Sequence, residues 1–191
     1  MAVGVPENPI FIGIDPGSFR AGLVILGPEL DLPLAEELIS IRAQLGNIER
    51  CHKISNELGA LLENFEFSFG VACIERPFSV NKSAFGTQMK TIGYMQRVLL
   101  DFNIDILEPD NMTIKQHAGA VTAHKTSLHA AIYRDYGYSH ESADVKDAYA
   151  MAHFARCYAF PNYYTAKQRL IVTEMIRKSP SRSYLREPLH G

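Results

Sequence analysis

The sequence predicts an α/β fold in which one mixed, five-stranded sheet is flanked by helices on both faces. Three observations support this expectation. The chain begins with short apolar stretches of strand length, and later ones alternate with helical stretches. The stretches 47–65 and 83–102 repeat apolar residues at helical spacing. The stretch 69–74 is continuously apolar, as in a strand that is buried on both faces.

The expected elements can be followed along the chain in order. A turn at Pro16-Gly17-Ser18 separates the first two strands, which form an antiparallel meander with the third. The expected strands are 10–15, 21–26, 38–41, 69–74 and 104–107. The expected helices are 47–65, with an apolar stripe that begins at Ile48, then 83–102, 111–118, 125–135, 143–159 and, in the last part of the chain, 166–177.

The composition is typical of one globular domain. The chain has 191 residues, of which 47% are hydrophobic, and this is enough for a buried core. No apolar run reaches the roughly 18 residues that a membrane span needs, so no membrane association is expected. The first residues lack the basic-then-apolar order of a signal peptide. Three isolated cysteines are expected to be reduced, as in a cytoplasmic protein.

Charge is distributed unevenly although the net charge is only −2. Residues 1–66 carry ten acidic and four basic side chains, residues 67–160 carry nine of each, and residues 161–191 carry two acidic and six basic. We therefore expect a folded domain over 1–160 and a basic C-terminal tail over 161–191. A neutral central region with a basic tail is compatible with a nucleic-acid partner.

Four acidic side chains fall where expected elements end or begin. Asp15 closes the first strand, Glu75 follows the fourth, and Asp144 and Asp147 lie one turn apart at the start of an Ala-rich helix. Functional groups gather at strand ends in sheets of this class. Carboxylates without Cys or His ligands suit Mg²⁺ or Mn²⁺, and two such ions side by side promote phosphodiester hydrolysis. The four acids therefore predict a metal-dependent nuclease.

Each acid also has a purely structural interpretation. Asp15 opens an Asp-Pro-Gly-Ser turn, where Asp is common. Asp144 lies where it could cap the helix or complement the helix dipole. Glu141 is a competing acid, which we expect to be solvated. The combination of the four acids favours metal binding, and Asp147 is the stronger candidate of the helical pair.

Three motifs together resemble RuvC-type Holliday junction resolvases, which belong to the ribonuclease H-like superfamily. The motifs are Gly13-Ile14-Asp15-Pro16-Gly17-Ser18, Ile74-Glu75 with Phe78 three residues beyond, and Ala143-Asp144-Val145-Lys146-Asp147-Ala148-Tyr149-Ala150. In addition, Lys115-Gln116 and Ala123-His124-Lys125-Thr126-Ser127 resemble the family's lysine-bearing segment. The resemblance covers about residues 10–158, and it implies a ribonuclease H-like catalytic domain over 1–160 of a divergent member, such as a phage-encoded one.

The resemblance implies a specific activity. The family consists of homodimeric endonucleases that resolve four-way DNA junctions by paired, metal-dependent hydrolysis. Asp15, Glu75, Asp144 and Asp147 would bind Mg²⁺, two ions in each active site, with Mn²⁺ as a substitute. Lys125 would lie near the scissile phosphate. The expected location is the cytoplasm of a bacterial cell or of a phage-infected host.

The resemblance also implies where DNA and a second subunit bind. Lys115 would contact DNA, and Phe78 would stack on or wedge between bases at the junction centre. Arg76 and Lys82 flank Phe78 in the sequence and could meet phosphates. The helix at 83–102 would form the dimer interface, for which its apolar positions include Phe85, Met89, Ile92 and Met95.

Other functions share parts of this pattern. An RNA–DNA hybrid ribonuclease or a transposase-like core uses the same carboxylates, although a transposase normally has separate end-binding domains. A sugar kinase or actin-like ATPase also has an Asp-x-Gly phosphate loop, but it needs two domains and a second such loop. A non-catalytic junction-binding protein would have no need of the four acids.

Overall fold

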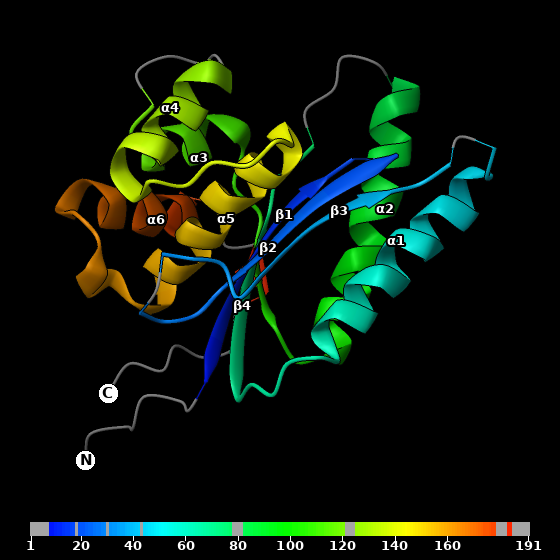
Figure 1. Ribbon diagram of the computed structural model, residues 1–191, viewed down its shortest axis with the longest axis horizontal. Coiled ribbons are helices and arrows are strands. Elements are labelled where there is room, and N and C mark those ends of the chain that lie inside the picture. Colours follow the sequence, from blue (N-terminus) through cyan, green and yellow to red (C-terminus); the bar gives the residue numbers. More distant parts are fainter. Residues whose placement is uncertain are drawn as a thin grey trace.

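In the computed structural model, the described residues form a mixed sheet of six strands, in the order β3-β2-β1-β4-β5-β6, which runs through the centre of the molecule (Figure 1). The strands are β1 (Pro9–Pro16), β2 (Arg20–Leu26), β3 (Ala35–Ser40), β4 (Phe69–Ile74), β5 (Asp105–Leu107) and β6 (Ser183–Tyr184). β1 is antiparallel to β2 and parallel to β4, so the sheet is mixed, as predicted. The five predicted strands are confirmed, and β6 adds a short edge strand antiparallel to β5.

The structure describes residues 8–17, 19–29, 31–42, 44–77, 82–120, 125–178 and 183–184, with the backbone only at 82–84, 125–126 and 183–184. The helices are α1 (Asn47–Leu62), α2 (Lys82–Asp101), α3 (Asn111–His117), α4 (Lys125–Tyr136), α5 (Ala143–Ala159) and α6 (Ala166–Lys178), with a 3-10 turn at Pro161–Tyr163. In this described part of the chain, no helix has both the length and the apolar character needed to span a membrane.

Helices cover both faces of the sheet (Figure 1). Side chains alternate between the two faces along each strand. In β1, Ile12 and Ile14 pack in the core formed with α1 and α2, whereas Phe11 packs in the core formed with α5. The helices α3, α4 and α6 each contact α5 on the side of that second core. The result is two apolar cores, one on each face of the sheet.

The helix α5 approaches the sheet unusually closely because two glycines face it. A Cβ atom added to Gly13 of β1 would lie 1.8 Å from the backbone oxygen of Ala148. A Cβ atom added to Gly22 of β2 would lie 2.2 Å from the backbone oxygen of Asp144. Only glycine allows a helix backbone this near to a strand, so these two residues determine where the start of α5 lies.

Two elements differ in detail from the prediction. The strand β3 begins before the predicted 38–41 stretch, and its added half contains Glu36 and Glu37. β3 is an edge strand, where charged side chains prevent pairing with another sheet. The apolar stripe of α1 was also predicted to begin too early, because Ile48 is 63% exposed while Cys51 is buried.

A polar cluster is buried at the end of α5. The Arg156 guanidinium donates to the Tyr164 hydroxyl at 2.8 Å and pairs with Asp31. His153 contacts the same hydroxyl at 2.9 Å, and His117 packs against the Tyr164 ring. Burial lowers the pKa of both histidines, that of His117 from 6.5 to about 3. Both imidazoles are therefore neutral in the folded protein.

Part of the region expected to be a basic tail is folded against the rest of the molecule. The helix α6 contacts α3 and α5, and β6 pairs with β5. The division into a domain over 1–160 and a tail over 161–191 remains a prediction.

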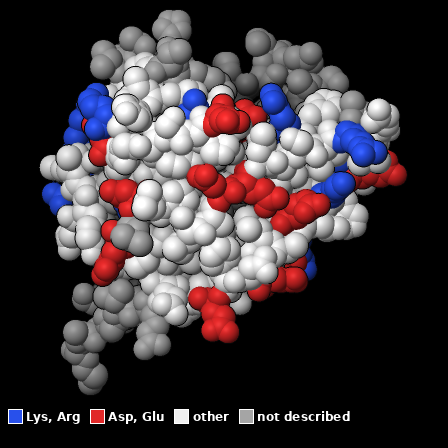
Figure 2. Space-filling model, viewed as in Figure 1, with Lys and Arg blue, Asp and Glu red and all other residues white. Residues whose placement is uncertain are grey.

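Charge differs between parts of the surface. In the view of Figure 2, which is that of Figure 1, acidic side chains gather in the middle of the face that carries β3. Glu36, which belongs to β3, is exposed. Because nucleic acids are polyanions, this face is unsuited to binding them.

Candidate active site

Two of the predicted acids leave the sheet side by side. The strands β1 and β4 are parallel neighbours in which Ile14 is paired with Ile74, and the Glu75 amide donates to the Ile14 carbonyl at 3.4 Å. Asp15 and Glu75, the next residues of these strands, therefore lie at the same end of adjacent strands. Both are partly exposed, so their carboxylates remain accessible from solvent.

The helix α5 brings the other two acids to this end of the sheet. Gly22, which allows the close approach of the Asp144 backbone, is the residue paired with Asp15 across β1 and β2. Asp144 lies in the first turn of α5 and is not its cap, because the Ser142 side chain accepts from the Val145 amide. This excludes a capping role for Asp144.

Glu75, Asp147 and Asp144 each contact a polar side chain from another element. The side-chain amide of Asn111, at the start of α3, donates a hydrogen bond to Glu75 Oε1 at 2.8 Å. His129 Nε2 on α4 lies 2.8 Å from Asp147 Oδ1. Arg20 Nε of β2 lies 3.6 Å from Asp144 Oδ2, and the arginine side chain in this pair is well exposed.

These three partners are not evident from the amino-acid sequence. His129 follows Lys125 by four residues, so both lie on one face of α4, and this spacing is the pattern that could have drawn attention to it. Asn111 directly follows Asp110, which caps α3 by accepting from the Thr113 amide. Arg20 sits next to an ordinary turn and has no distinguishing pattern.

The four acids match Mg²⁺ in chemistry, because this ion prefers carboxylate oxygens. Among the residues that the structure describes, no three acidic, histidine or cysteine side chains converge closely enough to hold a metal ion. Carboxylates without a neutralising cation repel one another at short range. Asn111, Arg20 and His129, which contact Glu75, Asp144 and Asp147, lie outside the group of four. The four carboxylates thus lie at one end of the sheet, but they do not converge on a common position that a metal ion could occupy.

The thiol nearest to these acids is not a reactive group. Cys73 of β4 is fully buried, and burial together with the nearby charge of Glu75 raises its pKa well above the ordinary value. A neutral buried thiol is neither a good nucleophile nor a hard-metal ligand. The chemistry of the site therefore depends on oxygen ligands.

Only some of the residues predicted to contact DNA have side chains that the structure describes. Arg76 is exposed directly beyond Glu75, while Lys115 on α3 is only 8% exposed. Lys82 and Lys125 are the first residues of α2 and α4, but their side chains lie outside the described residues. Phe78 lies outside them altogether.

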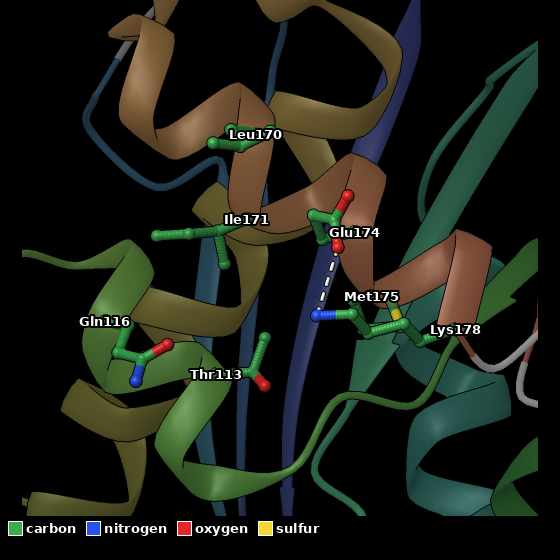
Figure 3. A pocket seen from close by; sticks show the side chains of 7 residues that line it. All are labelled: Thr113, Gln116, Leu170, Ile171, Glu174, Met175 and Lys178. Atoms are coloured by element: carbon green, nitrogen blue, oxygen red, sulfur yellow. Dashed lines mark ion pairs between the residues drawn. The ribbon is translucent and has the colours of Figure 1, made fainter.

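A separate groove lies between α3 and α6 (Figure 3). It has a cavity volume of about 290 Å³. Lys178 forms an ion pair with Glu174 at its rim, at 3.0 Å. Its lining residues are Thr113, Gln116, Leu170, Ile171, Glu174, Met175 and Lys178. None of the four acids lines this groove.

The sequence matches no protein-family model and no curated protein. The arrangement of strands and helices nevertheless defines an α/β fold class, which is that of RuvC. The fold is similar to that of Thermus thermophilus RuvC in complex with Holliday junction substrate, with a TM-score of 0.66, 16% identity, and coverage of 88% of this chain and 94% of that chain.

Two further solved structures share this fold. Another structure of Thermus thermophilus RuvC has a TM-score of 0.62 at 16% identity, covering 78% of this chain and 94% of that chain. The yeast mitochondrial Holliday junction resolvase Ydc2 has a TM-score of 0.53 at 9% identity, covering 89% of this chain and 82% of that chain. At such low identity the likeness establishes the fold.

Proposed function

We propose that the protein is a metal-dependent DNA endonuclease that resolves four-way junctions by paired nicks in the cytoplasm. The observation that carries this proposal is the placement of Asp15, Glu75, Asp144 and Asp147 at one end of a RuvC-type sheet. A solved protein of this fold is bound to Holliday junction substrate, which supports four-way DNA as the ligand.

The four acids would hold Mg²⁺ or Mn²⁺, two ions in each site. When bound, these ions would activate water for attack and offset negative charge on the departing 3′ oxygen, and hydrolysis of that bond would leave a 5′ phosphate on the product. Glu75 and Asp147 would keep their contacts with Asn111 and His129. The exposed pair between Arg20 and Asp144 is weak, so Asp144 would turn toward a metal more easily than Glu75 or Asp147 would.

Basic and aromatic residues around this sheet end would bind the junction. Lys125 would offset negative charge on the reacting phosphate. Arg76, Lys82 and Lys115 would contact the DNA backbone, with the buried Lys115 the most restricted of them. Phe78 would stack on unpaired bases, a contact that contributes about 1–3 kcal/mol per base.

The active form would be a homodimer built on α2. Phe85 and Met89 of this helix are 40% and 44% exposed, and an added Cβ at Gly86 or Gly93 would meet no atom within 4 Å. Ile92 and Met95 are instead buried in the core that the sheet forms with α1 and α2, so they are not available to contact a second subunit. A two-fold dimer would present one metal site to each of two equivalent junction strands.

The proposal is tested by incubating the protein with labelled four-way, duplex, flap and RNA–DNA hybrid substrates, with Mg²⁺ and with a chelator. We expect Mg²⁺-dependent cleavage of the four-way junction in preference to the others. Preferred cleavage of the hybrid would instead assign a ribonuclease. Tight junction binding without cleavage, in Mg²⁺ or Mn²⁺, would assign a non-catalytic binding protein.

A further inference from the structure

One histidine makes a direct contact with an acid of the proposed metal site. His129 Nε2 lies 2.8 Å from Asp147 Oδ1, a normal hydrogen-bond distance. The histidine side chain is 18% exposed and that of Asp147 only 6%. Water therefore competes little for this hydrogen bond, and the low local dielectric strengthens it.

Apolar residues that precede and follow His129 in α4 determine, through their packing, where the His129 ring lies. Leu128 and Ile132 of α4 are buried in the same core as Val145 and Tyr149 of α5. These contacts fix the rotation of α4 about its axis, which directs the ring of His129 to α5. The hydrogen bond thus connects two elements whose relative position is already determined by apolar packing.

We propose that His129 is a positioning residue, whose hydrogen bond limits the orientations that the Asp147 carboxylate can take when a metal ion binds. This inference rests on the proposed function. A hydrogen bond to Oδ1 restricts the side-chain torsions of Asp147, so the carboxylate does not lose orientational freedom when an ion arrives. Hydrogen-bonding partners of metal ligands typically change metal affinity or activity by about 10–100-fold when they are removed.

A positioning role suits the chemistry better than direct ligation. Imidazole nitrogen is a preferred ligand of zinc, copper and nickel, whereas carboxylate oxygen is preferred by magnesium and manganese. The Asn111 amide makes the corresponding contact with Glu75 at 2.8 Å. Two acids of the site are thus each held by a polar side chain from a neighbouring helix.

The experiment measures Mn²⁺ binding to the DNA-free protein by EPR titration, so its readout does not depend on cleavage. His129→Leu fills the space of the ring but donates no hydrogen bond, and we expect about 10–100-fold weaker Mn²⁺ binding. His129→Gln supplies an amide donor, which should restore much of the affinity. His52→Ala, at an exposed position on α1, is the matched control and should bind as the wild type does.

The outcomes separate a positioning role from other roles of His129. Unchanged Mn²⁺ affinity in His129→Leu would overturn the proposal, even with a lower melting temperature, because the role would then be packing alone. Pulsed EPR of the wild-type Mn²⁺ complex needs no variant. It should show no directly coordinated histidine nitrogen, and strong nitrogen coupling that is lost on ¹⁵N-histidine labelling would make His129 a ligand and overturn the proposal.

Asp15→Asn distinguishes failure of this inference from failure of the proposed function. If Asp15→Asn weakens Mn²⁺ binding and His129→Leu does not, only the role of His129 is overturned. If the wild-type protein binds no Mn²⁺, or if Asp15→Asn binds it equally well, the metal site and the role of His129 are overturned together.

Discussion

At the scale of single residues, Glu75, Asp147 and Asp144 differ in how their carboxylates are held. Glu75 and Asp147 each contact a polar side chain from a neighbouring helix at 2.8 Å. Asp144 is paired with a well-exposed arginine over a longer distance, 3.6 Å. This difference matters because a metal site gains from ligands that are oriented in advance.

The first prediction concerns the two acids at the strand ends. Asp15→Asn or Glu75→Gln should lower junction cleavage by several orders of magnitude, because each would remove one of the proposed metal ligands. Junction binding in the absence of metal should be retained or tighten, since a negative charge near phosphates is lost. Gel-shift and cleavage assays on one junction measure both quantities.

The control for these variants is Glu141→Gln, which removes an exposed acid close in sequence to Asp144. Its cleavage rate should be that of the wild type. Cleavage close to the wild-type rate by Asp15→Asn in Mg²⁺ would contradict the assignment of the site.

The second prediction concerns the pH dependence of folding. The pKa of His117 is lowered by burial from 6.5 to about 3, so the unfolded chain binds a proton that the folded protein does not. The free energy of unfolding should be highest above pH 6.5 and should fall by about 1.4 kcal/mol per pH unit below it, for each such histidine. Urea unfolding between pH 7.5 and pH 4.5 measures this slope.

His117→Phe tests the assignment of that slope. The phenyl ring keeps the contacts with the neighbouring aromatic rings of Phe154 and Tyr164 but cannot be protonated. In this variant the free energy of unfolding should change with pH about half as steeply as in the wild type. The remaining slope would come from His153, because burial lowers its pKa as well. A slope that stays unchanged would show that other groups cause it.

Sequence alone predicts the acids but not their partners. Asp15, Glu75, Asp144 and Asp147 can be found because each stands at a predictable element boundary. The contact of His129 with Asp147 depends on how α4 rotates against α5, which is decided by packing between helices. The spacing of apolar residues in the sequence indicates which face of a helix is buried. It does not indicate how that helix is rotated about its axis relative to a neighbouring helix.

At the scale of elements, the site depends on the close approach of α5 to β1 and β2. Gly13 and Gly22 permit this approach, and the second of them is paired with Asp15. The distance between the strand-end acids and the helical acids is therefore set by two residues without side chains.

The third prediction follows from this close approach. Gly22→Ala would place a methyl group 2.2 Å from the Asp144 backbone oxygen, so α5 must shift. We expect a loss of about 2–3 kcal/mol in the free energy of unfolding, measured by urea denaturation. Cleavage should fall as well, because Asp144 moves away from Asp15.

Gly59→Ala in α1 is the matched control, since its new methyl would make an ordinary contact at 3.7 Å with Val98. Alanine in a helix interior should raise stability by about 0.5–1 kcal/mol. Equal effects of the two substitutions would contradict the role given to Gly22.

The predictability of an element depends on how strongly it is buried. The strands β1, β2 and β4 could be predicted because their residues are almost continuously buried and apolar. The first half of β3 was missed because an edge strand carries charges, and β6 has only two residues. Such edge strands form because a neighbouring strand is already in place, which the local sequence does not encode.

At the scale of the whole molecule, the acidic face over β3 and the proposed dimer surface on α2 restrict where DNA can lie. The exposed acids in the middle of that face (Figure 2) would repel a polyanion. Junction arms should therefore approach the end of the sheet at which Asp15 and Glu75 lie.

The fourth prediction concerns the dimer. Met89→Glu places a charge among the exposed apolar residues of α2, and burying it against a second copy would be unfavourable. The variant should be monomeric by light scattering and should make unpaired nicks or none. Leu170→Glu, at an exposed apolar position on α6, should remain dimeric, and a wild-type protein that is monomeric both free and on junction DNA would contradict the prediction.

The central claim is that two carboxylate sites act together on one four-way junction. The most direct measurement is cleavage of a supercoiled plasmid that extrudes a cruciform, in Mg²⁺, with the products separated by gel electrophoresis. Paired nicks across the junction convert the plasmid to linear DNA, and we predict that linear DNA is the main early product of the wild-type protein and is absent with Asp15→Asn. Nicked circles alone, or equal cleavage of a plasmid without the cruciform, would contradict the claim.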